Sequence, residues 1–240
     1  MSISEEITKL QNNLEAAFNS ISSKGGTVPT KICFDNLSST IQNLNPLINN
    51  VVIAGSPTVQ GHKVSNFSAS NYIKTNTTLR CYVNNVSATW EVQLKIMTGS
   101  VSGTQALIGG ETNMISGVFL AIVNGGLRLQ ASSNGSKWNL VSEKTTTNTL
   151  QANQTYWVRL AHIARNNQWD FQISVSTNGT SFTEWLYTGS STNGGPNPGA
   201  LVLGQNASAS PFLGSIDLSD CYIKMGSVYL WRGCYNNAKA

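Results

Sequence analysis

The acidic side chains of this sequence are too sparse and too far apart to form a catalytic pair. Hydrolysis of a glycosidic bond with retention needs two carboxyl groups about 5 Å apart, which alternate positions on one strand can provide. No two carboxylates after residue 50 are spaced by two or four positions, and Asp217 and Asp220 are expected on opposite faces of an extended strand. We therefore predict no catalytic residue and no enzymatic activity. The carboxylates concerned are Glu91, Glu111, Glu143, Asp170, Glu184, Asp217 and Asp220.

Histidine and cysteine are also scarce, and their spacing predicts no metal site. The cysteines lack the short paired spacings of zinc ligands, and His162 fits a core position in an alternating strand. No glycine-rich loop precedes a helix, so we expect no cofactor. Synthesis in a cytoplasm favours free buried thiols, and Cys221–Cys234 is the expected pair if a disulfide exists. The four cysteines are Cys33, Cys81, Cys221 and Cys234.

Aromatic and amide side chains could support noncovalent recognition. Sugars stack their apolar faces on Trp and Tyr and form hydrogen bonds with Asn and Gln. Trp138 and Trp185 follow Asn-Gly turns, Trp169 follows the polar stretch RNNQ, and Tyr187 comes two positions after Trp185. These four residues are the candidate ligand-binding residues. The alternative is that most of the tryptophans are core residues.

One short motif occurs twice. SSNGSKW contains Asn134-Gly135, and STNGTSF contains Asn178-Gly179. Asn-Gly tolerates the positive φ angles that a type I′ hairpin turn needs, and alternating apolar residues flank both copies. Each copy therefore predicts a strand, a tight turn at Asn-Gly and a second strand. A role of these loops in recognition stays open.

The composition combines an ordinary apolar content with little charge. Apolar residues make up 40% of the 240 residues and charged residues 11%, against about 25% charged residues in an average domain. Asn, Ser, Thr, Gly and Gln replace the charge, as in extracellular and virion β-proteins. The basic residues form no run, so we expect no nucleic-acid partner. No apolar stretch reaches about 18 residues and no signal peptide is recognisable, so we expect synthesis in a cytoplasm without membrane insertion.

The first 48 residues have helical periodicity. Their spacing predicts a helix over 3–22 and a second over 34–45, too small together to bury their own apolar faces. A coiled coil that forms a homo-oligomer, with a trimer favoured, is one interpretation, and a helix docked on its own domain is the other. The apolar residues Ile3, Ile7, Leu10, Leu14, Ala17 and Ile21 are spaced by 4, 3, 4, 3 and 4 positions, and the last five are the predicted oligomerisation residues.

From residue 51 onward the sequence shows the two-residue alternation of β-strands. Short apolar stretches are separated by Gly, Asn and Ser clusters, and no helical period interrupts them. The fold class is therefore mainly β, with one antiparallel β-sandwich over residues 51–240 after a helical segment over residues 1–48.

The stretch from Trp90 to Gly233 resembles the concanavalin A-like, laminin G-like jelly-roll family. TYWVRLAHI (155–163) is similar to the family's central strand, STNGTSF to its hairpin, and ALVLG (200–204) with PFLGSIDLSDCYIKMGSVYLWRG to its closing strands. The resemblance implies a jelly-roll sandwich. It implies no single activity, because this fold hosts lectins, glycanases and inert spacers.

Residues 14–44 resemble a short helical module of phage and prophage tail or baseplate proteins. Phe18 replaces a residue that is usually small in that module. The resemblance implies a bacteriophage virion appendage, a tail, baseplate or fibre protein whose residues 1–48 contact other virion proteins. The matching positions are Ala16, Ala17, Ile21, Lys24, Gly25, Gly26, Thr27, Phe34, Leu37, Ile41 and Leu44.

Two functions from different classes follow from these resemblances. In the first, the jelly-roll head binds a neutral or mildly acidic glycan of the host cell surface. In the second, the chain is a purely structural virion component, a decoration or spacer without a ligand. A concave groove lined by aromatic side chains would favour binding, and a flat Asn- and Thr-rich surface would favour the structural role.

Overall fold

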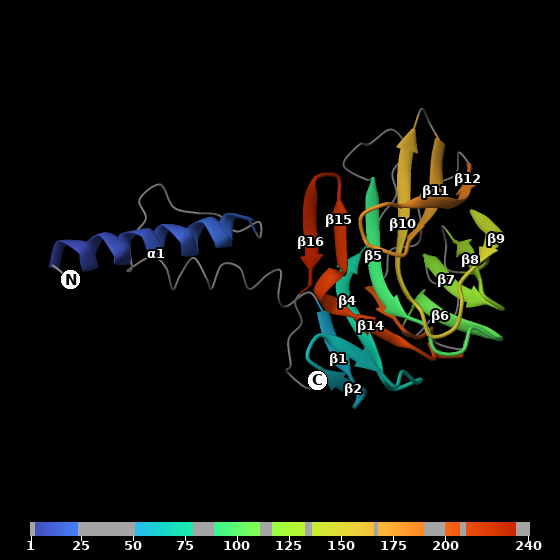
Figure 1. The fold of residues 1–240 in the computed structure, drawn as a ribbon. Coiled ribbons are helices and arrows are strands. Elements are labelled where there is room, and N and C mark those ends of the chain that lie inside the picture. Colours follow the sequence, from blue (N-terminus) through green and yellow to red (C-terminus); the bar gives the residue numbers. More distant parts are fainter. Residues whose placement is uncertain are drawn as a thin grey trace. The chain divides into compact units, whose positions relative to one another are not determined.

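A computed structural model describes residues 3–23, 51–78, 89–110, 117–132, 136–165, 168–189, 200–206 and 210–233. The chain divides into two compact units, Met1–Asn49 and Asn50–Ala240. The first contains helix α1 (Ile3–Ser23), close to the predicted bounds. The predicted helix over 34–45 lies outside the described residues. The second unit contains two antiparallel β-sheets (Figure 1).

Helix α1 buries only part of its predicted oligomerisation stripe. Leu14 is 8% exposed, whereas Ile7 and Leu10 are 52% and 53% exposed. Ala17 is half-buried, and the side chain of Ile21 is not among those described. The N-terminal half of the stripe therefore faces solvent in the isolated chain. Within the described residues, no helix has both the length and the apolar character that crossing a bilayer requires.

The first sheet has seven strands in the order β1-β4-β13-β6-β7-β8-β9. A two-residue turn joins β7 to β8, where Asn124 and Gly125 have φ angles of +50° and +88°. Both central residues at positive φ are the mark of a type I′ turn. The strands are β1 (Val51–Ala54), β4 (Tyr72–Thr78), β13 (Ala200–Leu203), β6 (Thr104–Gly109), β7 (Val118–Val123), β8 (Gly126–Ala131) and β9 (Val141–Thr149).

The second sheet has nine strands, in the order β12-β11-β10-β5-β14-β3-β2, with β15 paired to β5 and β16 paired to β15. One strand, β5, is thus central to the sheet, with β10 on one side and both β14 and β15 on the other. The strands are β2 (Thr58–Gln60), β3 (Lys63–Ser65), β5 (Trp90–Met97), β10 (Thr155–Arg165), β11 (Gln168–Ser176), β12 (Thr183–Thr188), β14 (Ser215–Asp217), β15 (Tyr222–Met225) and β16 (Val228–Arg232).

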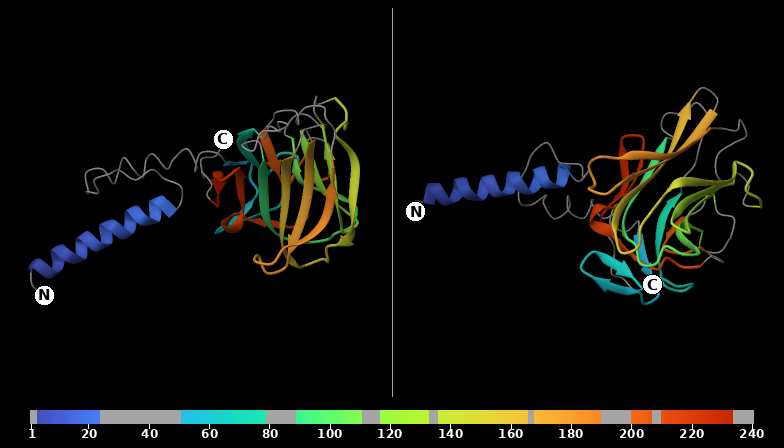
Figure 2. Two further views of the ribbon diagram at one scale, coloured as in Figure 1. Left: turned by 90° about the horizontal axis from the view of Figure 1, so that it is seen from above. Right: turned by 45° about the vertical axis from the view of Figure 1, so that its right-hand side comes forward.

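The core lies between the two sheets. In β5 the alternate side chains Trp90, Val92, Leu94 and Ile96 are each 1% exposed and belong to one apolar cluster that includes residues of both sheets. Figure 2 shows the two layers, with β10–β12 in one and β7–β9 in the other. The predicted antiparallel jelly-roll β-sandwich is confirmed. Its alternation leaves every second residue of β5 and β10 on the outer face of the nine-stranded sheet.

The loop at Asn178-Gly179 joins two strands as predicted, but its turn is not of type I′. Gly179 has a φ of +77°, whereas Asn178 is not at positive φ. The Asn178 Oδ1 atom accepts hydrogen bonds from the backbone N–H groups of Thr180 and Ser181, both at 2.9 Å. This side-chain acceptor replaces a backbone carbonyl and favours a wider loop over residues 177–182. The predicted turn at Asn134-Gly135 lies outside the described residues.

Candidate functional site

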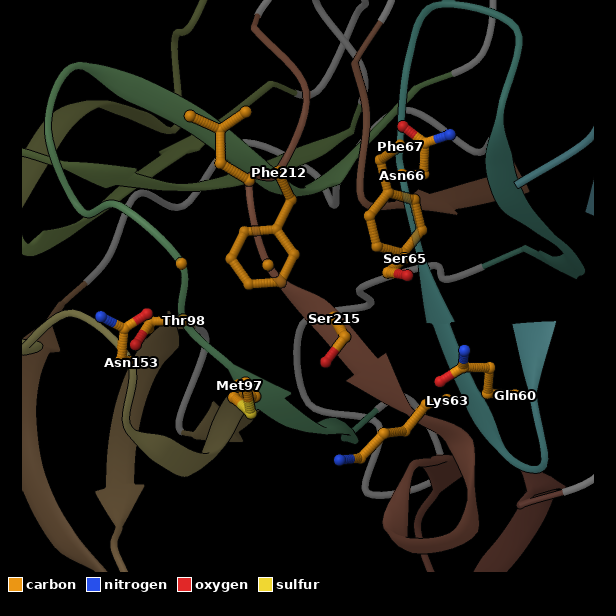
Figure 3. Close-up of a pocket in the computed structure, with 13 residues that line it drawn as sticks. Gln60, Lys63, Ser65, Asn66, Phe67, Met97, Thr98, Asn153, Phe212 and Ser215 are labelled. Carbon is orange, nitrogen blue, oxygen red and sulfur yellow. The ribbon is translucent and has the colours of Figure 1, made fainter. Parts of the chain in front are cut away.

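A cavity of about 580 Å³ opens where β3, β5 and β14 end side by side. We call it the main cavity (Figure 3). Ser215, at the start of β14, pairs with both Ser65 and Met97, which end β3 and β5. The hairpin of β2 and β3, the end of β5, the loop at Asn153 and the segment before β14 together form its lining.

Two phenylalanine rings form the apolar base of the main cavity. Phe67 and Phe212 are 5% and 1% exposed, and their ring centroids lie 6.1 Å apart. Behind them the two backbone segments at Gly99 and Gly214 touch directly. A Cβ on Gly99 would lie 1.9 Å from the Leu213 oxygen. Glycine is therefore required for the segments to approach this closely and support the rings.

The polar lining consists of amide and hydroxyl groups that are available for a ligand. The side chains of Gln60, Ser65, Asn66, Asn153 and Ser215 line the cavity and form no hydrogen bond with the part of the chain that the structure describes. Asn66 and Asn153 have φ angles of +63° and +56°, a region that Asn adopts more readily than other non-glycine residues. Their backbone conformation positions both amides at the cavity.

Thr98 also lines the cavity, but its hydroxyl group has a structural role. It donates to the carbonyl oxygens of Gln151 and Gln154 at 2.7 and 3.1 Å and accepts from the Gln154 N–H at 3.0 Å. The Asn153 N–H donates to the Thr98 carbonyl at 3.1 Å. These bonds hold the loop that carries the Asn153 amide against the end of β5.

The rim of the main cavity is apolar and carries one charge. Met97 and Leu213 are 42% and 55% exposed, so their surfaces can receive the C–H face of a ligand. Lys63 is the one charged residue in the described lining, which includes no carboxylate. Lys63 lies in the short hairpin of β2 and β3. It pairs with Gln60 across the turn at Gly61, and the φ of +59° at Gly61 suits a type II′ turn.

A second cavity of about 230 Å³ adjoins the first. Lys63, Met97 and Ser215 line both cavities, and Lys95, Thr155 and Asp217 line only the second. The ammonium group of Lys95 lies 3.0 Å from Asp217 and 3.1 Å from Asp220. Lys95, one of the two lysines of this second cavity, is thus paired with carboxylates within the protein.

Asp217 and Asp220 converge on the same lysine, so the expectation that they lie on opposite faces of a strand was wrong. A 3₁₀ turn, Leu218–Asp220, interrupts the predicted strand and brings both carboxylates to Lys95. Burial favours a higher pKa for Asp217, but hydrogen bonds from Ser219 and Lys95 outweigh it and hold this pKa below the usual value. A general acid near neutral pH needs a raised pKa. Asp217 therefore does not suit the role of a general acid.

The other described carboxylates of the sandwich also have partners. Glu91 Oε1 accepts a hydrogen bond from the Tyr222 hydroxyl and lies 3.1 Å from Lys224 Nζ and 3.8 Å from Arg159 Nε. Among the described residues no group of three or more His, Cys, Asp or Glu side chains could hold a metal ion. Glu143, Asp170 and Glu184 contact Arg128, Tyr187 and Gln172, respectively, and Glu111 lies outside the described residues.

Cys221 is a free thiol in the core of the second unit. It is 1% exposed, and burial raises its pKa to about 12. Its sulfur donates to the Asp217 carbonyl and accepts a hydrogen bond from the Lys95 N–H at 3.4 Å. This contact replaces the strand pairing that the 3₁₀ turn removes from β5. Cys234 lies outside the described residues.

Of the four predicted ligand-binding aromatic residues, the three whose side chains the structure describes, Trp138, Trp185 and Tyr187, do not line either cavity. Trp138 is half-buried and stacks on Phe119, with ring centroids 6.1 Å apart, in a small cluster separate from the main core. Tyr187 is 41% exposed and donates its hydroxyl hydrogen to the buried carboxylate of Asp170. The side chain of Trp169 is not among those described.

A β-bulge places Trp185 against the core. Ile173 pairs with Leu186 and Ser174 pairs with Glu184, so Trp185 is the extra residue on β12. The bulge turns Trp185 toward the core beside Leu186, and the tryptophan is half-buried there. The three described aromatic residues thus do not form one surface, and the part of all four in binding stays a prediction.

No protein-family model and no curated protein matches the chain. Solved structures with similar folds include the binding domain of botulinum neurotoxin DC in complex with SialylT (12% identity, TM-score 0.47, 76% of this chain and 42% of that chain). Others are the binding domain of botulinum neurotoxin serotype D (15%, 0.46, 73% and 43%) and a heptameric SAP-like pentraxin from Limulus polyphemus (18%, 0.42, 73% and 76%). This chain spans less than half of the neurotoxin chains. Similarity at this level assigns no ligand or activity.

Proposed function

We propose that the chain is a non-enzymatic, glycan-binding component of a phage or prophage virion appendage, a tail, baseplate or fibre. In this proposal the jelly-roll head binds a glycan of the host surface in the main cavity, and residues 1–48 attach it to other virion proteins. The proposal rests on the lining of the main cavity. Amide and hydroxyl groups line this cavity, and the exposed side chains of Met97 and Leu213 form its rim. Sugars offer matching hydroxyl groups and apolar C–H faces.

The charges of the site support binding without catalysis. The described lining of the main cavity includes no carboxylate. Asp217, in the second cavity, has a lowered pKa and shares Lys95 with Asp220. A glycosidase needs one carboxylic acid that is protonated at the working pH. We therefore assign these groups to structure rather than to bond cleavage.

The helical segment supports the virion context. Residues 14–44 resemble the tail and baseplate module, and Ile7 and Leu10 expose apolar side chains at coiled-coil spacing. Such a stripe suits association with further copies or with another virion protein. Several heads on one assembly would raise weak single-site binding by roughly 10²–10⁴-fold where the geometry allows simultaneous contact.

A glycan array with the full chain tests the binding function. Asn66→Gly and Asn153→Gly remove the two amides while glycine keeps the positive φ. Each should weaken binding by roughly 5- to 10-fold, the effect of one neutral hydrogen bond. Asn124→Gly, also at positive φ but outside the cavity, is the matched control and should bind as the wild type does. Wild-type binding by both cavity variants, or no bound glycan at all, would contradict the assignment.

Mass spectrometry of purified phage particles and immunogold labelling test the virion context. The proposal expects the chain in particles, with the label on the appendage. A particle-bound chain that binds no array glycan would favour the purely structural role. A chain that binds glycan but is absent from particles would refute only the virion context.

A further inference from the structure

The two cavities are parts of one depression, since Lys63, Met97 and Ser215 form their common wall. Their volumes, about 580 and 230 Å³, together fall within the range of small-molecule sites. We propose that they form one groove for an acidic oligosaccharide, with a sugar subsite in each cavity and a ligand carboxylate bound by Lys63 at the junction. This inference rests on the proposed glycan-binding function of the main cavity.

The first argument for the carboxylate contact is the position of Lys63. Lys63 begins β3, directly after the turn of the hairpin, and its side chain is exposed. Figure 3 shows this side chain extending toward the part of the cavity where Met97 lies. An ammonium group at the wall between two cavities can contact a ligand that passes from one to the other.

The second argument for the carboxylate contact is the set of charged groups around Lys63. Lys95, the other lysine of the groove, is held by two carboxylates at 3.0 and 3.1 Å. Asp217 is the cross-strand neighbour of Lys63, but its carboxylate contacts Lys95 and accepts the Ser219 hydroxyl hydrogen at 2.7 Å. Lys63 forms no ion pair with any carboxylate that the structure describes. The groove therefore offers a ligand one ammonium group that no described carboxylate contacts, and a carboxylate is the complementary group.

The second cavity supplies the second subsite. Thr155 and Ser215 both line it, and their hydroxyl groups form no hydrogen bond within the described part of the chain. Ser215 also lines the main cavity, whereas Thr155 lines only the second. A single sugar in the main cavity would leave the Thr155 hydroxyl unused, whereas an oligosaccharide that also enters the second cavity would reach it.

A double-mutant cycle between protein and ligand tests the carboxylate contact. The probes are size-fractionated fragments of the best-bound array polysaccharide, native and after chemical reduction of their carboxyl groups to alcohols. We expect Lys63→Gln to weaken binding of the native fragments by roughly 10-fold or more, the effect of a charge-assisted hydrogen bond. Reduction of the fragments should weaken their binding to the wild type by the same factor. Lys63→Gln should then cause no further loss of affinity for the reduced fragments. Lys144→Gln, an equal charge change on β9, is the control and should leave affinity unchanged.

Fragment length tests the second subsite. Thr155→Val removes a hydroxyl group and should weaken binding of long fragments by roughly 3- to 10-fold, but not binding of the shortest bound fragment. Reduced fragments that bind the wild type as well as native ones do would overturn the carboxylate contact, although the glycan-binding function would stand. An equal effect of Thr155→Val at every length would overturn the two-subsite groove. Failure of every glycan to bind would refute both the inference and the function beneath it.

Discussion

His162 is an ionisable residue inside the apolar core. It is fully buried, and its ring centroid lies 5.7 Å from that of Trp90 and 5.5 Å from that of Phe171. Burial lowers its pKa to about 4, although interactions with Asp170 partly oppose the shift. The imidazole is therefore neutral in the folded protein at pH 7, and an imidazolium there would be unfavourable.

This buried histidine predicts acid sensitivity. Because the pKa is about 4 in the folded chain and 6.5 in the unfolded chain, the unfolded chain binds a proton first as the pH falls. The free energy of unfolding should therefore be fully retained above pH 6.5 and lose on the order of 2–3 kcal/mol by pH 4. Urea unfolding at several pH values measures it. His162→Gln should flatten this part of the pH dependence, whereas His62→Gln, at an exposed position, should not; the same slope in both variants would refute the explanation.

At the scale of elements, the close approach of the segments at Gly99 and Gly214 sets the floor of the main cavity. A Cβ on Gly214 would lie 2.1 Å from the Met97 carbonyl oxygen and 2.5 Å from the Phe212 ring. The nearer neighbour is backbone, so a small side-chain movement cannot relieve the overlap. The end of β5 and the start of β14 must separate instead.

Gly214→Ala should accordingly destabilise the sandwich by about 1–3 kcal/mol, a cost typical of overpacking a buried contact. Thermal or urea unfolding of the second unit measures the loss. Ser215→Ala changes the next residue without adding a Cβ, and it should alter stability by less than about 0.5 kcal/mol. A Gly214→Ala variant as stable as Ser215→Ala would show that the two segments do not constrain each other.

The elements differ in how far the sequence could predict them. The alternation of apolar residues was sufficient to predict strands β5 and β10, because four side chains of each strand enter the core. The hairpin of β2 and β3 was missed, since each strand has three residues and Val64 alone is buried. The bulge at Trp185 was also missed, because one extra residue changes which face a side chain occupies without changing the alternation that is read from the sequence.

The main cavity could not be predicted, because its lining comes from segments far apart in the chain. Gln60, Asn153 and Ser215 share no local pattern. Hydrophobic periodicity identifies strands but does not determine which strand ends meet. The positive φ of Asn66 and Asn153 is a property of the folded loops. The sequence-based candidates were large aromatics, whereas the structure assembles small polar side chains over a buried Phe pair.

At the scale of the whole molecule, helix α1 has an apolar stripe of uneven exposure. Leu14 is 8% exposed and Phe18 is fully buried, whereas Ile7 and Leu10 are more than half exposed. Phe18, the aromatic residue that departs from the pattern of the phage module, is thus a buried residue. Association through the stripe should depend on Ile7 and Leu10, since Leu14 is already covered.

Ile7→Asp with Leu10→Asp should convert an oligomer to a monomer, or release the chain from its virion partner, without unfolding the head. Two buried carboxylates at a coiled-coil seam would be unpaired and costly. Size-exclusion chromatography with light scattering measures the mass. Gln11→Glu with Asn12→Asp adds the same charge at exposed polar positions of α1 and should keep the wild-type mass. A wild-type chain that is monomeric and does not bind virions would refute the association.

The central position of β5 also determines when the sandwich can form during protein synthesis. This strand pairs with β14 and β15, which the ribosome produces more than a hundred residues later. Until Met225 has been translated, β5 lacks its neighbours on one side and leaves apolar side chains uncovered. The nine-stranded sheet therefore cannot be completed before β15 has been synthesised, as non-local strand pairing requires. Ribosomes that stall before β14 would carry nascent chains that expose an apolar strand edge, which is a template for aggregation.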